Sequence, residues 1–219
     1  MTDYVDVDEL AEQLQIPDGG DAALLQSAVT SASRAVDSWC GRSFAADVAA
    51  TARTFRPDGD SYVLPVDDFW DTASLVVKTD SGDNGTFDQT WTLTRDYVIE
   101  PFNGVVDGIS GWPYSTISAV GSRYFPRGQF ASGRRARCQV TAKWGWAAVP
   151  EPVFQATKIK AARLFQRKDA VGGQGGFSGG SSGFSVPLIR IDVREDPDVV
   201  ELLRVYQKVG GTSGVFVCG

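Results

Sequence analysis

The spacing of apolar residues changes twice along this chain, and this change restricts the fold more than any other feature. Between Asp21 and Cys40, apolar residues recur every three or four positions, which is typical of one face of an α-helix. Between about 50 and 146, short segments alternate with a period of two between Gly, Pro and Asp turns, which indicates strands. Helical spacing returns at Pro150. The pattern predicts an α+β fold: a helical bundle core with an inserted small antiparallel β-barrel or sandwich unit.

These changes divide the chain into four predicted parts. Residues 1–49 are the N-terminal helices of the core, 50–146 the inserted β unit, and 147–209 the C-terminal helices of the core. The third part contains a glycine-rich loop over 172–183, which is flexible by composition. Residues 210–219 are predicted to be a flexible C-terminal tail, and its β-prone apolar stub is Val215, Phe216 and Val217.

The helix ends carry their own signals. Asp6 fits the N-cap of a helix over about 7–14, with Glu9 as the capping-box partner. Asp21 is expected to cap the next helix, and Gly41 to supply the left-handed residue after its end. Further helices are expected over about 150–168 and 197–208. In the last one, Val200, Leu203 and Tyr206 are predicted to face inward.

The strand signals are short. Strands are expected over 51–55, 62–66, 73–79, 91–94, 97–99, 117–120 and 138–144, with a strand-like stretch over 184–193. The clearest is 138–144, where Cys138, Val140, Ala142 and Trp144 share one face. Asp67 and Asp68 are interpreted as turn residues rather than as ligands of a divalent cation.

The residue types needed for most catalytic sites are missing or scattered. The chain has no histidine, which removes most catalytic triads and zinc hydrolases. Cys40, Cys138 and Cys218 are far apart and form no CxxC pair, so they are interpreted as buried or free thiols. There is no Walker loop, and no carboxylate pair for glycoside hydrolysis stands out. We therefore expect no metal, no cofactor and no enzymatic activity.

Charge is distributed unevenly. The net charge of −6 argues against a surface that grips duplex DNA. The first 21 residues are acidic and contain no Lys or Arg, whereas residues 123–168 are basic with Glu151 as their only acid. This asymmetry suits contacts between identical copies in a ring, although two solvated faces would also explain it. The acidic start lacks a secretory signal and no apolar run is long enough for a membrane, which predicts a cytoplasmic protein.

Five tryptophans fall in or beside the strand region: Trp70, Trp91, Trp112, Trp144 and Trp146. Sugar-binding modules often use tryptophans as stacking platforms, so a carbohydrate- or ligand-binding β module with helical flanks is the main alternative class. Packing in a core or an interface explains the same residues, and we favour packing.

Two short motifs, together with the order of elements, resemble the head-to-tail connector (adaptor) family of long-tailed bacteriophages. Members often carry a D..CGR.F segment after the second helix, and the corresponding residues here are Trp39, Cys40, Gly41, Arg42 and Phe44. A second family passage, WG…VP, corresponds to Trp144, Gly145, Val149 and Pro150. The resemblance extends from about Tyr4 to Tyr206, and the family assigns no catalytic role to these residues.

The resemblance implies a structural virion protein. It implies a homo-oligomeric ring of twelve copies that docks on the portal protein and links it to the stopper or tail, with double-stranded DNA passing through the lumen without sequence-specific binding. The expected location is the head–tail junction of the virion, after assembly in the host cytoplasm. Another neck protein, such as a stopper, is the near alternative. The stub Val215, Phe216 and Val217 is expected to add as a strand to the portal or to a neighbouring subunit.

Overall fold

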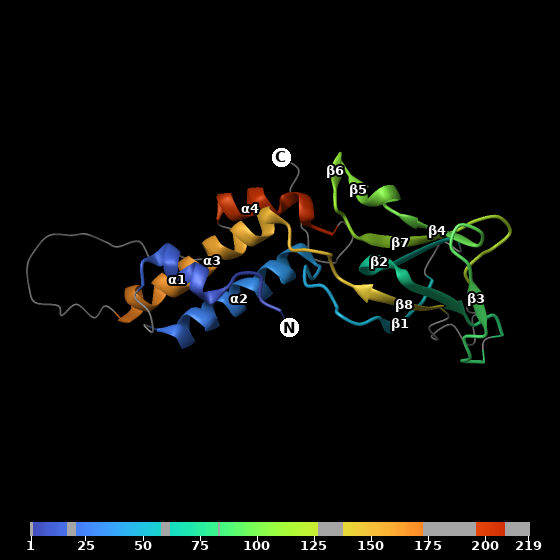
Figure 1. Cartoon of the computed structure of the whole chain (residues 1–219), viewed down its shortest axis with the longest axis horizontal. Helices are drawn as coiled ribbons and strands as arrows, with labels where there is room; N and C mark the ends of the chain where they lie inside the picture. The colour runs from blue at the N-terminus through green and yellow to red at the C-terminus, as the bar shows by residue number, and fades with distance from the viewer. Residues whose placement is uncertain are drawn as a thin grey trace, which may run out of the picture. The chain divides into compact units, whose positions relative to one another are not determined.

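The computed structural model describes residues 2–16, 21–57, 62–82, 84–126, 138–172 and 196–208, with side chains up to 166 in the fifth range (Figure 1). The chain divides into two compact units. We call residues 1–42 with 149–219 the helical unit, and residues 43–148 the β unit. The α+β class and the antiparallel pairing of the strands are confirmed.

Four α-helices form the described part of the helical unit. They are α1 (Val7–Leu14), α2 (Ala22–Cys40), α3 (Glu151–Gly172) and α4 (Pro197–Leu203), which continues into the 3-10 turn η3 (Arg204–Tyr206). Helix α2 packs against α3, α1 contacts both, and α4 packs against α3 (Figure 1). Their shared core includes Leu10, Leu25, Val29, Ala32 and Ala161. The structure shows these helix pairs in contact, and their arrangement as a helical bundle core stays a prediction.

The helix ends largely follow the local signals. The capping box of α1 is complete, because Asp6 accepts a hydrogen bond from the first turn and Glu9 accepts one from the Asp6 N–H. Gly41 is left-handed and ends α2, with its N–H donating to the Asp37 carbonyl. Asp21 occupies the N-cap of α2 but makes no side-chain capping bond, because its own backbone is left-handed. The side-chain cap expected there is wrong.

The last helix is shorter than predicted. It ends at Leu203 and tightens into η3. The buried residues are Val199, Leu203 and Tyr206, which are spaced by four and three positions and so share one face. Val200 lies one residue off this stripe and is only half-buried, so its predicted inward position is wrong.

The β unit contains an open antiparallel sheet. Its strands are β1 (Thr51–Phe55), β2 (Val63–Thr79), β3 (Gln89–Trp91), β4 (Tyr97–Glu100), β7 (Tyr114–Ala119) and β8 (Cys138–Trp144). Their order is β1-β8-β2-β7-β4, and β3 pairs with β2 off this path. Because β1 and β4 are not paired with each other among the described residues, the sheet does not close and the predicted barrel is wrong.

A single long strand, β2, replaces two of the predicted short ones. Its register shifts after Pro65 and again around Asp71, so it bends between its neighbours β7 and β8. Asp67 and Asp68 lie inside this strand, and their interpretation as turn residues is wrong. Asp67 forms a 2.8 Å ion pair with Arg53 of β1, and Asp68 accepts a 3.1 Å hydrogen bond from the Trp146 indole. Partners from other segments therefore stabilise carboxylates that local preference assigns to a turn.

Strand β8 matches its prediction in bounds and in face. Cys138, Val140, Ala142 and Trp144 are buried, and the residues between them are half-exposed. This face forms the centre of the β-unit core, which also receives Leu64 and Phe69 from β2 and Ile117 from β7.

A small hairpin was not predicted. Strands β5 (Val105–Val106) and β6 (Ile109–Ser110) pair across Asp107 and Gly108, after the 3-10 turn η1 (Phe102–Gly104). Both turn residues have positive φ, at 51° and 79°, as a two-residue hairpin turn requires. The Asp-Gly dipeptide was therefore a readable signal for this element.

Candidate functional site

The predicted binding segment lies outside the described residues. Val215, Phe216 and Val217 belong to 209–219, and the glycine-rich loop lies outside as well, apart from Gly172 at the end of α3. The chain that leads to the tail is nevertheless anchored. The Lys208 N–H donates a 2.9 Å hydrogen bond to the Cys40 carbonyl, so the tail departs from the C-terminal end of α2.

The first motif forms the end of α2 and the start of the β unit. Trp39 and Arg42 are half-buried, and Cys40 is buried. Burial raises the pKa of the Cys40 thiol to about 12, so this thiol is not a nucleophile near neutral pH. Phe44 is buried in the β unit, where its ring lies 5.2 Å from that of Trp146.

The second motif makes a tight backbone contact. Gly145 has a φ of +93°, and a Cβ placed on it would lie 1.7 Å from the Ala45 carbonyl oxygen. Two backbone hydrogen bonds surround this contact: Gly145 donates to the Asp68 carbonyl at 2.7 Å, and Asp47 donates to the Trp144 carbonyl at 2.8 Å. Only glycine fits here, so the motif residue has a structural role. Pro150 is half-buried directly before α3, and the N–H groups of Val153 and Phe154 donate to its carbonyl.

The tryptophans are packing residues. Trp91, Trp112, Trp144 and Trp146 are buried, while Trp39 and Trp70 are half-buried. Trp112 lies 5.0 Å from Trp146, and Trp91 stacks on Phe125 at 4.7 Å. The four buried rings are not the open, solvent-facing platforms that sugar stacking needs.

The perturbed carboxylates hold segments together. Backbone and arginine hydrogen bonds from Thr92 and Arg123 lower the pKa of Asp96 to about 2. Burial raises the pKa of Asp37, although a hydrogen bond from Tyr4 and the charge of Arg34 oppose this shift. Among the described residues, no group of three or more Cys, Asp or Glu side chains could hold a metal ion.

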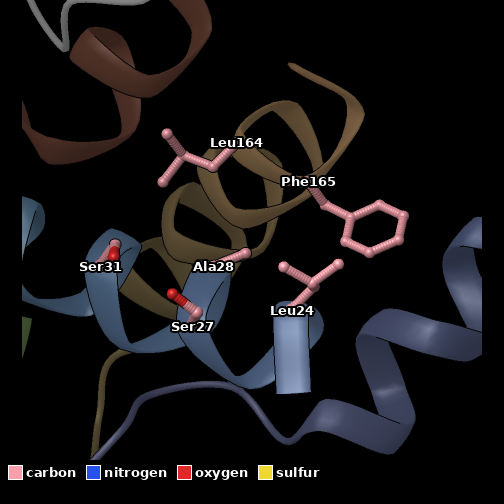
Figure 2. A pocket seen from close by; sticks show the side chains of 6 residues that line it. All are labelled: Leu24, Ser27, Ala28, Ser31, Leu164 and Phe165. Carbon is pink, nitrogen blue, oxygen red and sulfur yellow. The ribbon is translucent and has the colours of Figure 1, made fainter. Parts of the chain in front are cut away.

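A groove lies between α2 and α3 of the helical unit (Figure 2). Its volume is about 230 Å³, and it is lined by Leu24, Ser27, Ala28, Ser31, Leu164 and Phe165. Leu24 is 44% exposed at its edge. This groove was not predicted from the sequence. Its only signal in the sequence was Leu24, a leucine beside the core stripe that contains Leu25.

No described helix is both long and apolar enough to span a bilayer.

The comparisons with known proteins identify the fold. No protein-family model matches the chain, and no curated protein matches it. A chain from a solved structure of the neck of an empty gene transfer agent (GTA) particle, computed with C6 symmetry, matches with a TM-score of 0.51 and 15% identity, covering 96% of this chain and 93% of that chain. A chain from the virion of a native GTA particle matches with a TM-score of 0.48 and 16% identity, over the same shares. The chain thus shares its fold with a neck chain of a GTA particle, consistent with the head-to-tail connector family that its motifs resemble.

Proposed function

We propose that this chain is a structural neck protein, the adaptor subunit that docks on a portal and links it to the stopper or tail. The observation that carries the proposal is the fold likeness to a GTA neck chain, because it extends over nearly the whole of both chains. The two motifs support it independently, since they were matched to the connector family from sequence alone.

The proposed assembly is a homo-oligomeric ring of twelve copies with double-stranded DNA passing through its lumen. The C6 symmetry of the matched neck supports a ring, and twelve copies are consistent with that symmetry. The net charge of −6 suits a channel that lets DNA slide without gripping it. We place the ring at the head–tail junction of the virion, after assembly in the host cytoplasm.

The buried tryptophans count against the main alternative. A carbohydrate-binding β module would present its aromatic rings to solvent, whereas Trp91, Trp112, Trp144 and Trp146 are at most 8% exposed. Their packing serves a rigid scaffold instead.

The test is assembly on purified portal rings. We expect the chain to bind portal complexes in a closed ring, seen by negative-stain imaging and by the mass of the complex, whether the isolated chain is monomeric or not. A stopper would bind only portals already loaded with an adaptor. No binding to portal rings, or binding only after an adaptor is supplied, would contradict the adaptor role.

The tail is proposed to make the portal contact. Gly210, Gly211 and Gly214 precede the β-prone apolar stub, which suits addition of a strand to the portal or to a neighbouring subunit. Truncation after Gly211 is expected to abolish portal attachment without unfolding the subunit. Full attachment of the truncated chain would show that the tail is dispensable.

A further inference from the structure

We propose that the groove between α2 and α3 binds the C-terminal tail of the same chain in the isolated subunit, with Phe216 as the inserted side chain. The inference deepens the binding role proposed for the tail, because it names a surface that receives the tail before any partner is present.

The size and chemistry of the groove fit a peptide side chain. Its volume of about 230 Å³ is below the ~300–1,000 Å³ of a small-molecule pocket. Leu24, Leu164 and Phe165 give it apolar walls, and no lining residue is charged. The hydroxyls of Ser27 and Ser31 line the same groove on α2, where they can bond a peptide backbone (Figure 2).

The composition of the tail matches this lining. Residues 209–219 contain no charged side chain, and Phe216 is their only large apolar residue. In an extended segment, Phe216 points to the side opposite Val215 and Val217, so one ring can enter a groove while its neighbours cover the rim. Residues 184–189 are also largely apolar and uncharged, but four charged residues follow them directly, Arg190, Asp192, Arg194 and Glu195, whereas the tail is uncharged throughout.

The length of the tail and its starting point place the groove within reach. The described chain ends at Lys208, which is hydrogen-bonded to Cys40 at the end of α2. At 1.5 Å per residue, Ala28 lies about 18 Å and Leu24 about 24 Å back along the helix from Cys40. Eight extended residues from Lys208 to Phe216 span up to ~26 Å. The stub therefore reaches the groove of its own subunit without any change in the helices.

The native cysteines provide a direct test. Cys218 directly follows the stub, whereas Cys40 and Cys138 are at most 1% exposed and do not compete for oxidant. In the full-length chain, a Ser27→Cys substitution places a thiol in the groove. A Ser38→Cys substitution is the matched control, because Ser38 is exposed and lies eleven residues, about three turns, further along the same side of α2. It is also closer to the origin of the tail.

Mild oxidation with diamide should then form an intrachain disulfide with Cys218 at least about tenfold faster in the Ser27→Cys variant than in the Ser38→Cys variant. A tail that is not docked gives the reverse order, because its r.m.s. reach of ~17 Å over ten residues favours the nearer site. Adding Phe216→Ser should abolish the advantage of Ser27→Cys, and Cys218→Ser should abolish the cross-link.

Two outcomes would overturn the proposal. Equal or reversed rates would show that the groove does not hold the tail. Disulfides that join two chains, seen as dimers on a non-reducing gel, would assign the groove to the tail of a second copy. Because the rates are measured in the isolated subunit, either result leaves the adaptor proposal to be decided by the portal-binding experiment.

Discussion

The contact between Gly145 and Ala45 leads to a quantitative prediction. In the Gly145→Ala variant, the added Cβ would lie 1.7 Å from the Ala45 carbonyl oxygen, and real Cβ contacts stay above 3.0 Å. The opposing atom belongs to the backbone, so a rotamer change cannot relieve the overlap. The two segments must separate, and the hydrogen bonds from Gly145 to Asp68 and from Asp47 to Trp144 stretch with them.

The cost has two parts. Left-handed backbone costs a non-glycine residue about 1–2 kcal/mol. Weakening two backbone hydrogen bonds adds ~1–3 kcal/mol, since each contributes roughly 0.5–1.5 kcal/mol. We therefore expect Gly145→Ala to lower the free energy of unfolding of the β unit by ~2–5 kcal/mol, a large share of the ~5–15 kcal/mol typical of a whole domain.

Gly121→Ala is the matched control. Gly121 belongs to the same unit and also has a positive φ, +66°, but a Cβ there would meet nothing within 4 Å. Its expected cost is the backbone part alone, ~1–2 kcal/mol. Urea unfolding followed by tryptophan fluorescence suits the comparison, because five of the six tryptophans belong to residues 43–148. If the two variants unfold within ~0.5 kcal/mol of each other, the close approach to Ala45 has no energetic role.

Three further predictions concern single side chains. Gly41→Ala should destabilise the helical unit by only about 1 kcal/mol in urea unfolding, because Gly41 has a left-handed φ but an added Cβ would make only an ordinary 3.8 Å contact with the Lys208 side chain. The pKa of Asp96 is lowered to about 2, so its contribution to stability is present above pH ~4 and is lost as the pH falls toward 2. In the Asp96→Asn variant, the urea midpoint should therefore depend less on pH across that window. A pH dependence equal to that of the unsubstituted chain would contradict this. With a pKa of about 12, the buried Cys40 thiol should resist iodoacetamide at pH 8 until urea unfolds the chain, as judged by mass spectrometry; rapid labelling in the native state would contradict it.

Sequence predicted the elements whose determinants are local. The capping box of α1 needs only Asp6 and Glu9, which are three residues apart. The end of α2 needs only Gly41. The alternation in 138–144 predicts which face of β8 is buried, because side chains alternate between the two faces of a strand. Each of these signals lies within one element, so no knowledge of tertiary contacts was required.

The errors arise where distant residues decide. Asp67 and Asp68 look like a turn because their partners come from distant positions in the sequence: Arg53 from β1 and Trp146 from the segment after β8. The sheet is open because β1 and β4 do not pair among the described residues, and the register shifts of β2 have no sequence marker. The groove escaped notice for the same reason: Leu24 and Phe165 are far apart in sequence and meet only because α2 packs on α3.

One glycine in each of the two motifs that carry the family resemblance has a structural role. Gly41 ends a helix, and Gly145 permits a backbone contact with a segment 100 residues earlier. Both requirements come from the backbone, so they do not depend on the identity of most other side chains. Substitutions in the motifs should therefore change stability first. A substitution at Phe216 should leave the subunit folded and change what the tail binds. Measuring both properties in the same variants separates the residues that build the subunit from those that connect it.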